Sequence, residues 1–213
     1  IFFENSCSNR LIYSPFEEFS DSLKVFASPQ IKNKGTLIGN IANGSPIGDS
    51  IPFLYVSDAS LELLGTNGAR EVLIPDFYLG YKKFNLKADE IITKVKIPKK
   101  NKQFKIYKVS ARKDLDISAV SLALGYKIEN DKIIDISIAY GGVAATVYKA
   151  KALEEILLNK EIKKEYFEEA ISLIPSLLTP FSDHRGSSEF RIKLCQNLLM
   201  KFYSEIASQR EVA

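Results

Sequence analysis

Residues 34–52 read KGTLIGNIANGSPIGDSIP, and this stretch decides how the rest of the chain is interpreted. It contains four glycines, two prolines, two asparagines, two serines and one aspartate. Glycine adopts backbone conformations that strain other residues, and proline fixes φ and lacks an amide hydrogen. The composition therefore predicts a loop of exposed amides and small hydroxyls, and neither a helix nor a regular strand. Such a loop either holds an anion or a polar cofactor by its main chain or is an ordinary glycine-rich surface loop.

The bulk composition is that of an ordinary globular protein. Of 213 residues, 46% are hydrophobic and 26% are charged, and the net charge is +3. Basic residues form no stripe with interleaved aromatics, so we expect no nucleic-acid partner. No apolar run approaches the roughly 18 residues that span a bilayer, so we expect no membrane partner. Residues 1–10 lack a charged leader and a cleavage site, so we expect no secretory signal.

Scarce residue types also limit the possible chemistry. Cys7 and Cys195 lie far apart in the sequence, and two reduced thiols in a cytoplasmic protein are expected rather than a disulfide. A single histidine, His184, argues against a His-rich metal site or a Ser-His-Asp triad. Because no methionine comes first, we expect the sequence to begin within a longer polypeptide or after processing. Since cysteine and histidine are so scarce, any chemistry is expected to come from a cofactor.

The first part of the chain is predicted to mix short helices and strands. Ser14 and Pro15 are a typical helix start, and Ser28-Pro29 is expected to end that helix. Its buried face is formed by residues at helical spacing, namely Phe16, Phe19, Leu23 and Phe26. The elements expected next are an apolar helix at 49–57, a β-hairpin of 60–65 with 70–75, a helical or turn segment at 76–81, and a half-buried strand at 90–98 that places Ile92, Val95 and Ile97 inward.

The second part is predicted to be an antiparallel sheet followed by three helices. The charged run 99–102 marks the expected domain boundary, which gives domains at 1–100 and 101–213. The expected elements are a strand at 104–110, a hairpin of 117–128 with 132–140, and helices at 148–158, 164–178 and 187–208, the second of them kinked or broken at Pro175. The last helix carries an apolar stripe of Phe190, Leu194, Leu198, Phe202 and Ile206, widened by Leu199 and Tyr203. The fold class is therefore α+β, with the helices on one face of the sheet.

Several motifs resemble one known family in the same order along the chain. ASPQIKNKGTLIGNIANGSPIGD (27–49) resembles the second flavin-binding segment of the FAD subunit or domain of xanthine dehydrogenase and related molybdenum hydroxylases. DFYLGYKK (76–83) and EIITKVKIP (90–98) resemble the rest of that domain. The segments that resemble its CO dehydrogenase flavoprotein-type C-terminal domain are KVSARKDLDISAVSLAL (108–124), IAYGGVAATVYKA (138–150) and LTPFSDHRGSSEFR (178–191). The resemblance implies the second half of a flavin-binding (vanillyl-alcohol-oxidase/PCMH-type) domain, followed by a small antiparallel sheet with a three-helix layer.

The resemblance also implies a function. In such enzymes a molybdenum centre oxidises a purine, and electrons pass through 2Fe-2S clusters to FAD and then to NAD. This chain has no cysteine pattern for clusters, so the molybdenum cofactor and the clusters are expected on partner chains or domains. The implied partners are a molybdenum-binding subunit, an iron–sulfur domain or subunit, and the N-terminal part of the FAD domain.

Site residues follow from the resemblance position by position. The segment that matches the loop along the FAD diphosphate and ribityl chain comprises Thr36, Leu37, Ile38, Gly39 and Asn40. Asp49 matches an aspartate at the adenosine end, Phe26 an aromatic beside the adenine, and Ile92 an aliphatic residue near the flavin. Lys108 matches a lysine at the pyrimidine edge of the flavin, where a cation stabilises charge on the reduced ring.

Each assignment has an alternative. The alternative for Phe26 and Ile92 is a place in the core. The alternative for Lys108 is a solvated strand lysine, and that for Asp49 is a helix cap. The family has two adjacent glycines where this chain has Ile38 and Gly39, so a positive φ at Ile38 would be strained. Residues 111–116 either lie over the flavin near the nicotinamide approach or form a solvated turn. Residues 183–191 are expected to be structural, with Ser187 or Ser188 as a helix cap and with interdomain ion pairs from Arg185 and Arg191.

Two other functions stay open. The same flavin module serves enzymes that oxidise carbon monoxide, an aldehyde or an aromatic acyl-CoA, because the molybdenum subunit selects the substrate. The family's first, glycine-rich phosphate-binding segment is not found in these 213 residues. The chain is therefore either one part of a shared FAD site or a non-catalytic assembly module.

Overall fold

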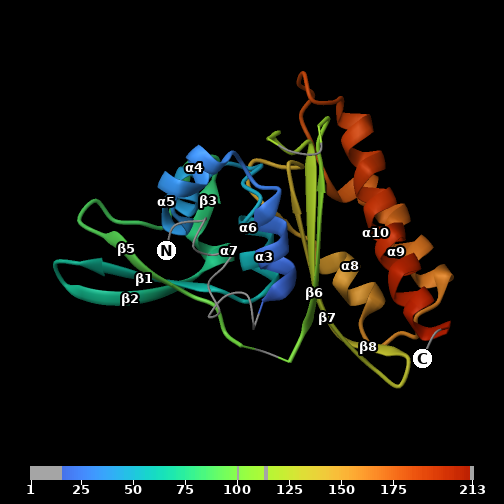
Figure 1. Cartoon of the computed structure of the whole chain (residues 1–213). Coiled ribbons are helices and arrows are strands. Elements are labelled where there is room, and N and C mark those ends of the chain that lie inside the picture. The colour runs from blue at the N-terminus through green and yellow to red at the C-terminus, as the bar shows by residue number, and fades with distance from the viewer. Residues whose placement is uncertain (1–15, 100, 113–114, 212–213) are drawn as a thin grey trace.

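A four-stranded antiparallel sheet divides the chain into two layers. The computed structural model describes residues 16–99, 101–112 and 115–211. The part before Lys100 is called the first half below, and the part after it the second half. In Figure 1 the sheet stands upright, with the helices of the second half on one side and the elements of the first half on the other.

The sheet and its helices are built from the second half. Its strands, in the spatial order β6-β7-β8-β9, are β6 (Gln103–Val109), β7 (Val120–Glu129), β8 (Lys132–Gly141) and β9 (Tyr148–Lys149). The helices are α8 (Lys151–Leu157), α9 (Lys164–Leu177) and α10 (Ser188–Glu211). The predicted hairpin is confirmed: β7 and β8 are paired antiparallel, and Asn130 and Asp131 at its turn both have positive φ.

Large and small side chains alternate along β7 and β8, and this alternation decides what packs on each face. Leu122, Leu124 and Tyr126 point into a core shared with α8, α9 and α10. Ala123 and Ala139 face the first half and belong to its core instead. Two residues after Ala123 on the same face, a Cβ on Gly125 would lie 2.9 Å from the carbonyl oxygen of Val56, so only glycine lets the first half come this close. The small face therefore seats the first half tightly against the sheet.

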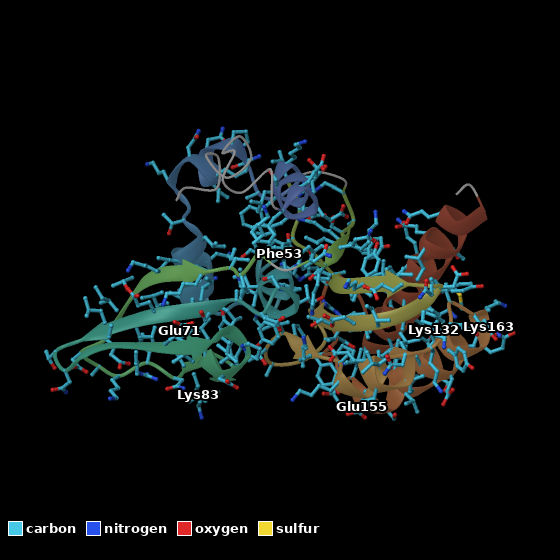
Figure 2. The ribbon with its side chains drawn as sticks, turned by 90° about the horizontal axis from the view of Figure 1, so that it is seen from below. Phe53, Glu71, Lys83, Lys132, Glu155 and Lys163 are labelled. Atoms are coloured by element: carbon cyan, nitrogen blue, oxygen red, sulfur yellow. The ribbon has the colours of Figure 1, made fainter. Side chains whose placement is uncertain are left out.

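The first half packs α6 (Ile51–Val56) on this small face. All six residues of α6 are buried, and Phe53 stacks on Phe19 with ring centroids 4.1 Å apart. Figure 2 shows Phe53 at the junction, with Glu71 and Lys83 to one side and Lys132, Glu155 and Lys163 to the other. The other helices in the described residues of the first half are α3 (Glu17–Lys24), α4 (Pro29–Lys34), α5 (Leu37–Asn43) and α7 (Ile74–Phe77).

A smaller sheet completes the first half. The predicted hairpin is confirmed as β1 (Ser60–Gly65) and β2 (Gly68–Leu73), and β5 (Ile91–Lys96) pairs with the other edge of β1. Residues after α7 form the short ladder of β3 (Tyr78–Gly80) and β4 (Lys83–Phe84). An ion pair also joins the halves, since Lys102 Nζ lies 3.0 Å from Asp135 and 3.7 Å from Asp58. The domain division at 99–102 stays a prediction, and Lys100 lies outside the described residues.

The prediction that 34–52 contains no helix is wrong. Leu37–Asn43 is helical, because the Thr36 hydroxyl accepts the amide hydrogen of Gly39 and Gly44 ends the helix at φ +58°. Leu37 and Ile41 are buried four residues apart, which stabilises the turn against the cost of its glycine. Ile38 therefore has a right-handed helical backbone and is not strained.

Other element boundaries differ from the sequence prediction. Ser28-Pro29 begins α4 rather than ending α3, since the Ser28 hydroxyl accepts the amide hydrogen of Ile31; Phe26 thus lies in the turn between the two helices. The predicted helix 148–158 begins only at Lys151, because Tyr148 and Lys149 pair with β8. Phe190 is 48% exposed and does not join the buried stripe of α10. The predicted cap at Ser14 and Pro15 lies outside the described residues.

Candidate functional site

Three side chains from distant segments meet where the halves touch. Lys108 Nζ, on β6, lies 2.8 Å from Asp49 Oδ2, just before α6. The hydroxyl of Ser118 donates to Asp49 Oδ1. Lys108 also donates to the carbonyl oxygen of Asp116 at 2.8 Å. The cluster exists because α6 packs on the small face of the sheet and brings Asp49 to the edge strand.

A hollow of about 350 Å³ opens beside this cluster. We call it the Asp49 hollow; its lining residues include Phe26, Ile31, Asn40, Asp49, Lys108, Leu115 and Ile117. Three of its apolar side chains are strongly exposed: Ile31 and Leu115 at 57% each and Ile117 at 49%. Exposed apolar surface around a few convergent polar groups is typical of a ligand site.

Asn40 links α5 to this hollow. Its side-chain oxygen accepts the Ser50 hydroxyl at 2.6 Å, and Ser50 is completely buried. The bond fixes the amide of Asn40 at the rim. The structure thus brings together four residues that the family resemblance selected, namely Phe26, Asn40, Asp49 and Lys108.

The other selected residues lie outside the Asp49 hollow. Thr36 caps α5, and Leu37 and Ile38 follow it in the first turn with Gly39. Ile92 lies on β5, pairs with Leu63 of β1 and packs against the core of the first half. Thr36 to Gly39 thus precede Asn40 along α5, Ile92 lies on β5, and none of these five residues lines the hollow. The predicted alternative for Asp49 is not what the structure shows, because Asp49 makes no cap bond to α6 and instead pairs with Lys108.

The segment 111–116 borders the Asp49 hollow and a second one. Lys113 and Asp114 lie outside the described residues. Arg112 donates its amide hydrogen to Asp116 at 2.8 Å, and this bond lowers the pKa of the Asp116 carboxyl. Leu115, Asp116 and Ile117 line both the Asp49 hollow and a space of about 390 Å³ that reaches His184 and Arg185.

Arg191 holds the chain in place at Ala119, three residues after this segment. Its guanidinium is completely buried and donates to the carbonyl oxygens of Ala119 and Gly142 and to Asp183 at 2.7 Å. Burial alone would raise the pKa of Asp183, but bonds from Arg185 and Arg191 lower it to about 2. These bonds agree with the predicted structural role of residues 183–191. Ser187 also accepts the amide hydrogen of Phe190, as expected of a helix cap. The structure gives no interdomain ion pair from Arg185 or Arg191 among the residues that it describes, where both pair with Asp183 of the same half.

Sequence reasoning missed Ser118 and Ser50. Both are buried serines that orient a selected polar side chain, and neither belongs to a recognisable spacing pattern. Only the folded chain reveals them, because it brings Ser118 to Asp49 and Ser50 to Asn40. Among the described residues, no group of three or more histidine, cysteine, aspartate or glutamate side chains is placed to bind a metal ion. No helix in the described ranges is both long and apolar enough to cross a membrane.

The residues present fit part of a flavin dinucleotide. The Asp49 hollow offers exposed apolar side chains for the faces of a flat ring system, and a lysine and a carboxylate for its polar edge. Lys108 Nζ is bonded to two acceptors within the part of the chain that the structure describes, and since an ammonium group has three donors, one is left there for a ligand. Each oxygen of Asp49 likewise accepts one bond and can accept another.

Comparison with known proteins agrees with this fit. Residues 4–100 match the FAD binding domain in molybdopterin dehydrogenase, and residues 105–206 match the CO dehydrogenase flavoprotein C-terminal domain. The glyceraldehyde dehydrogenase medium chain of Sulfolobus acidocaldarius is 30% identical over 200 residues, which are 94% of this chain and 71% of that protein. Xanthine dehydrogenase of Blastobotrys adeninivorans is 37% identical over 196 residues, which are 87% of this chain and only 14% of that protein. The carbon monoxide dehydrogenase structure from Hydrogenophaga pseudoflava shares the fold, with a TM-score of 0.89 at 24% identity over 94% of this chain and 70% of that one.

Proposed function

The chain belongs to the FAD-binding flavoproteins of the molybdenum hydroxylase family, and from this premise we propose that it forms one wall of the FAD site in a xanthine dehydrogenase. In the proposed enzyme, electrons from purine oxidation on a molybdenum-binding partner pass through 2Fe-2S clusters to FAD, and FAD reduces NAD. The membership confirms the resemblance inferred from the sequence. The purine substrate and NAD as acceptor are the proposed parts.

The observation that carries this proposal is the cluster of Asp49, Lys108 and Ser118 at the Asp49 hollow. A cation and a carboxylate are held side by side at the rim of a hollow that also exposes the apolar side chains of Ile31, Leu115 and Ile117. Flavin rings combine flat apolar faces with one polar edge, so this arrangement supports a flavin site better than a site for a small ion. FAD, when bound, would collect single electrons and pass them on as a pair, while the protein would orient the ring and tune its charge.

The roles of individual residues follow from their positions. Lys108 stabilises negative charge on the pyrimidine edge of the ring. Asn40 and Asp49 bind hydrogen-bond donors of the ligand, and Phe26 and Ile117 cover its faces. Asp49 and Lys108 lie 2.8 Å apart. While this ion pair is intact, both residues therefore contact the same part of the ligand. An assignment of Asp49 to the adenosine and Lys108 to the flavin requires the pair to open on binding.

A second substrate class is favoured by one comparison. The match to the glyceraldehyde dehydrogenase medium chain covers 94% of this chain and 71% of that protein, against 14% of the xanthine dehydrogenase of Blastobotrys adeninivorans. An aldehyde substrate is therefore the alternative to a purine. Substrate choice lies on the molybdenum-binding partner, so no residue described above separates the two.

The test uses the full-length flavoprotein purified together with its partner subunits. Flavin absorbance is followed without oxygen after addition of xanthine or of glyceraldehyde, and NAD is then added. The proposal predicts bleaching of the flavin by xanthine and recovery of its absorbance with NAD. Bleaching by glyceraldehyde alone supports the second substrate class, and an intact complex that contains no flavin contradicts the proposed function as a whole.

A further inference from the structure

We propose that Ser118 is a positioning residue of the flavin site: its hydroxyl holds the Asp49 carboxylate, and through it Lys108, at the wall of the Asp49 hollow. This inference rests on the proposed function. Ser118 Oγ donates to Asp49 Oδ1, while Lys108 Nζ donates to Asp49 Oδ2. The carboxylate is therefore fixed at both oxygens, and its plane cannot rotate without breaking a bond.

Ser118 cannot contact the ligand itself. Its residue is 1% exposed, whereas the side chains of Asp49 and Lys108 are 16% and 13% exposed. Any effect of the Ser118 hydroxyl on a ligand therefore passes through Asp49. This separates it from residues that line the hollow.

The backbone on both sides of Ser118 is anchored. The amide hydrogen of Ala119 bonds to the carbonyl oxygen of Val109 at 2.8 Å, and the carbonyl oxygen of Ala119 accepts from buried Arg191. On the other side, Asp116 accepts from Lys108 through its carbonyl oxygen. A serine on such a backbone presents its hydroxyl in one direction, which is the condition for positioning a neighbour.

The position of Asp49 matters for the ion pair as well. Lys108 reaches the rim of the hollow on a flexible four-carbon stem, and among the described residues Asp49 and the carbonyl oxygen of Asp116 hold its ammonium group. If the carboxylate of Asp49 turns, one of these two acceptors moves. Ser118 thus fixes the direction of both charged groups that face the hollow.

The chain provides a matched control in Ser121. It is also a buried serine, 2% exposed, and lies on β7 opposite Lys108 of β6. Its hydroxyl has no hydrogen-bond partner in the described ranges, so removing it breaks no bond there. Ser118→Ala and Ser121→Ala therefore delete the same atom from neighbouring buried positions, and only the first deletion frees Asp49.

The experiment is a double-mutant cycle on FAD binding. The full-length flavoprotein with its partner subunits is stripped of flavin and titrated with FAD, and the dissociation constant is read from flavin fluorescence. We expect Ser118→Ala to raise it about tenfold, as for loss of one hydrogen bond to a charged group, and Ser121→Ala to leave it within about twofold. In an Asp49→Ala background, Ser118→Ala should have no further effect, because the group on which it acts is gone.

The outcomes separate the two proposals. A wild-type protein that never binds FAD overturns the proposed function and this inference together. If the wild type binds FAD and Ser118→Ala binds equally well, the positioning role is overturned while the flavin site stands. An equal loss from Ser118→Ala with and without Asp49 points to a general structural role and also overturns it. Should Ser118→Ala fail to fold, the isosteric pair Ser118→Thr and Ser118→Val gives the same comparison, and only the threonine variant should retain tight binding.

Discussion

Lys108 Nζ lies 2.8 Å from Asp49 Oδ2, although 59 residues separate them in the sequence and they belong to different halves. The pair is mostly buried, and it connects the glycine-rich segment 34–52 to the edge strand of the main sheet. It forms because Gly125 and the alanines of the small face let α6 approach β7 and β8 closely. The packing of the core thus places the two charged groups of the candidate site.

Replacing Lys108 with methionine should weaken FAD binding. The variant removes the cation at the rim and leaves Asp49 partly buried without its ion-pair partner. We expect at least a tenfold rise in the FAD dissociation constant, measured by fluorescence titration of the stripped full-length protein. Lys105→Met is the control, because Lys105 lies on the same strand and its nearest carboxylate oxygen is 3.9 Å away on Glu205. Equal binding by both variants would contradict the role of Lys108.

The Arg70–Glu90 pair predicts a loss of stability in acid. Arg70 binds both oxygens of Glu90, at 2.7 and 2.8 Å, and these bonds lower the pKa of Glu90 from 4.5 to about 2. A carboxyl with a lowered pKa stabilises the fold above its unfolded value, and the contribution is lost as the pH falls toward its folded value. The gap in unfolding free energy between wild type and Glu90→Gln should therefore be constant above pH 4.5 and shrink between pH 4.5 and 2.

Urea unfolding at several pH values measures this gap. Glu168→Gln serves as the control, since Glu168 makes an exposed pair with Lys164 on α9 and should contribute little at any pH. If the difference in unfolding free energy between wild type and Glu90→Gln instead widens as the pH falls, the predicted pH dependence is contradicted.

Arg191→Met should be among the most destabilising changes in the second half. Its buried guanidinium joins Ala119, Gly142 and Asp183, and methionine fills much of the space but makes none of the bonds. Breaking a buried ion pair by removing one partner costs about 3–5 kcal/mol. Arg112→Met, at a side chain that is 72% exposed, should change the free energy of unfolding by less than about 0.5 kcal/mol. Similar unfolding curves for both variants would contradict the structural role.

The Cys195 thiol should be unreactive in the folded protein. It is completely buried on α10, and burial raises its pKa to about 12, so almost no thiolate exists at neutral pH. In a Cys7→Ser background, a thiol reagent should label the protein only as fast as it unfolds. Rapid labelling under native conditions would show that α10 does not pack as described.

The sequence predicted the element types well where the periodicity was long. The strands of the β1–β2 and β7–β8 hairpins and the helix α10 all follow their patterns. The prediction for 34–52 is wrong, because the glycine content indicates a loop. The Thr36 cap and the buried side chains of Leu37 and Ile41 nevertheless stabilise a helix there. Composition counts residues, whereas a cap depends on one residue at one position.

The candidate site was predictable only in part. Family resemblance selects Asp49 and Lys108, and the structure brings these two residues together. The resemblance does not select Ser118 or Ser50, because each acts through a hydrogen bond to a residue distant from it in the sequence. Phe190 on α10 is a second example. Its spacing predicts burial, but its side chain lies beyond the end of the core and is exposed. Contacts between segments distant in sequence are not contained in local periodicity.

Hydrogen–deuterium exchange with and without FAD tests the central claim most directly. The measurement is made on the full-length flavoprotein, and the exchange of each peptide is compared between the two states. The account predicts that FAD slows exchange in residues 34–52 and 103–119, which surround the Asp49 hollow, and leaves the hairpin 60–73 unchanged. Saturating FAD that binds the protein but protects neither of the first two segments would contradict it.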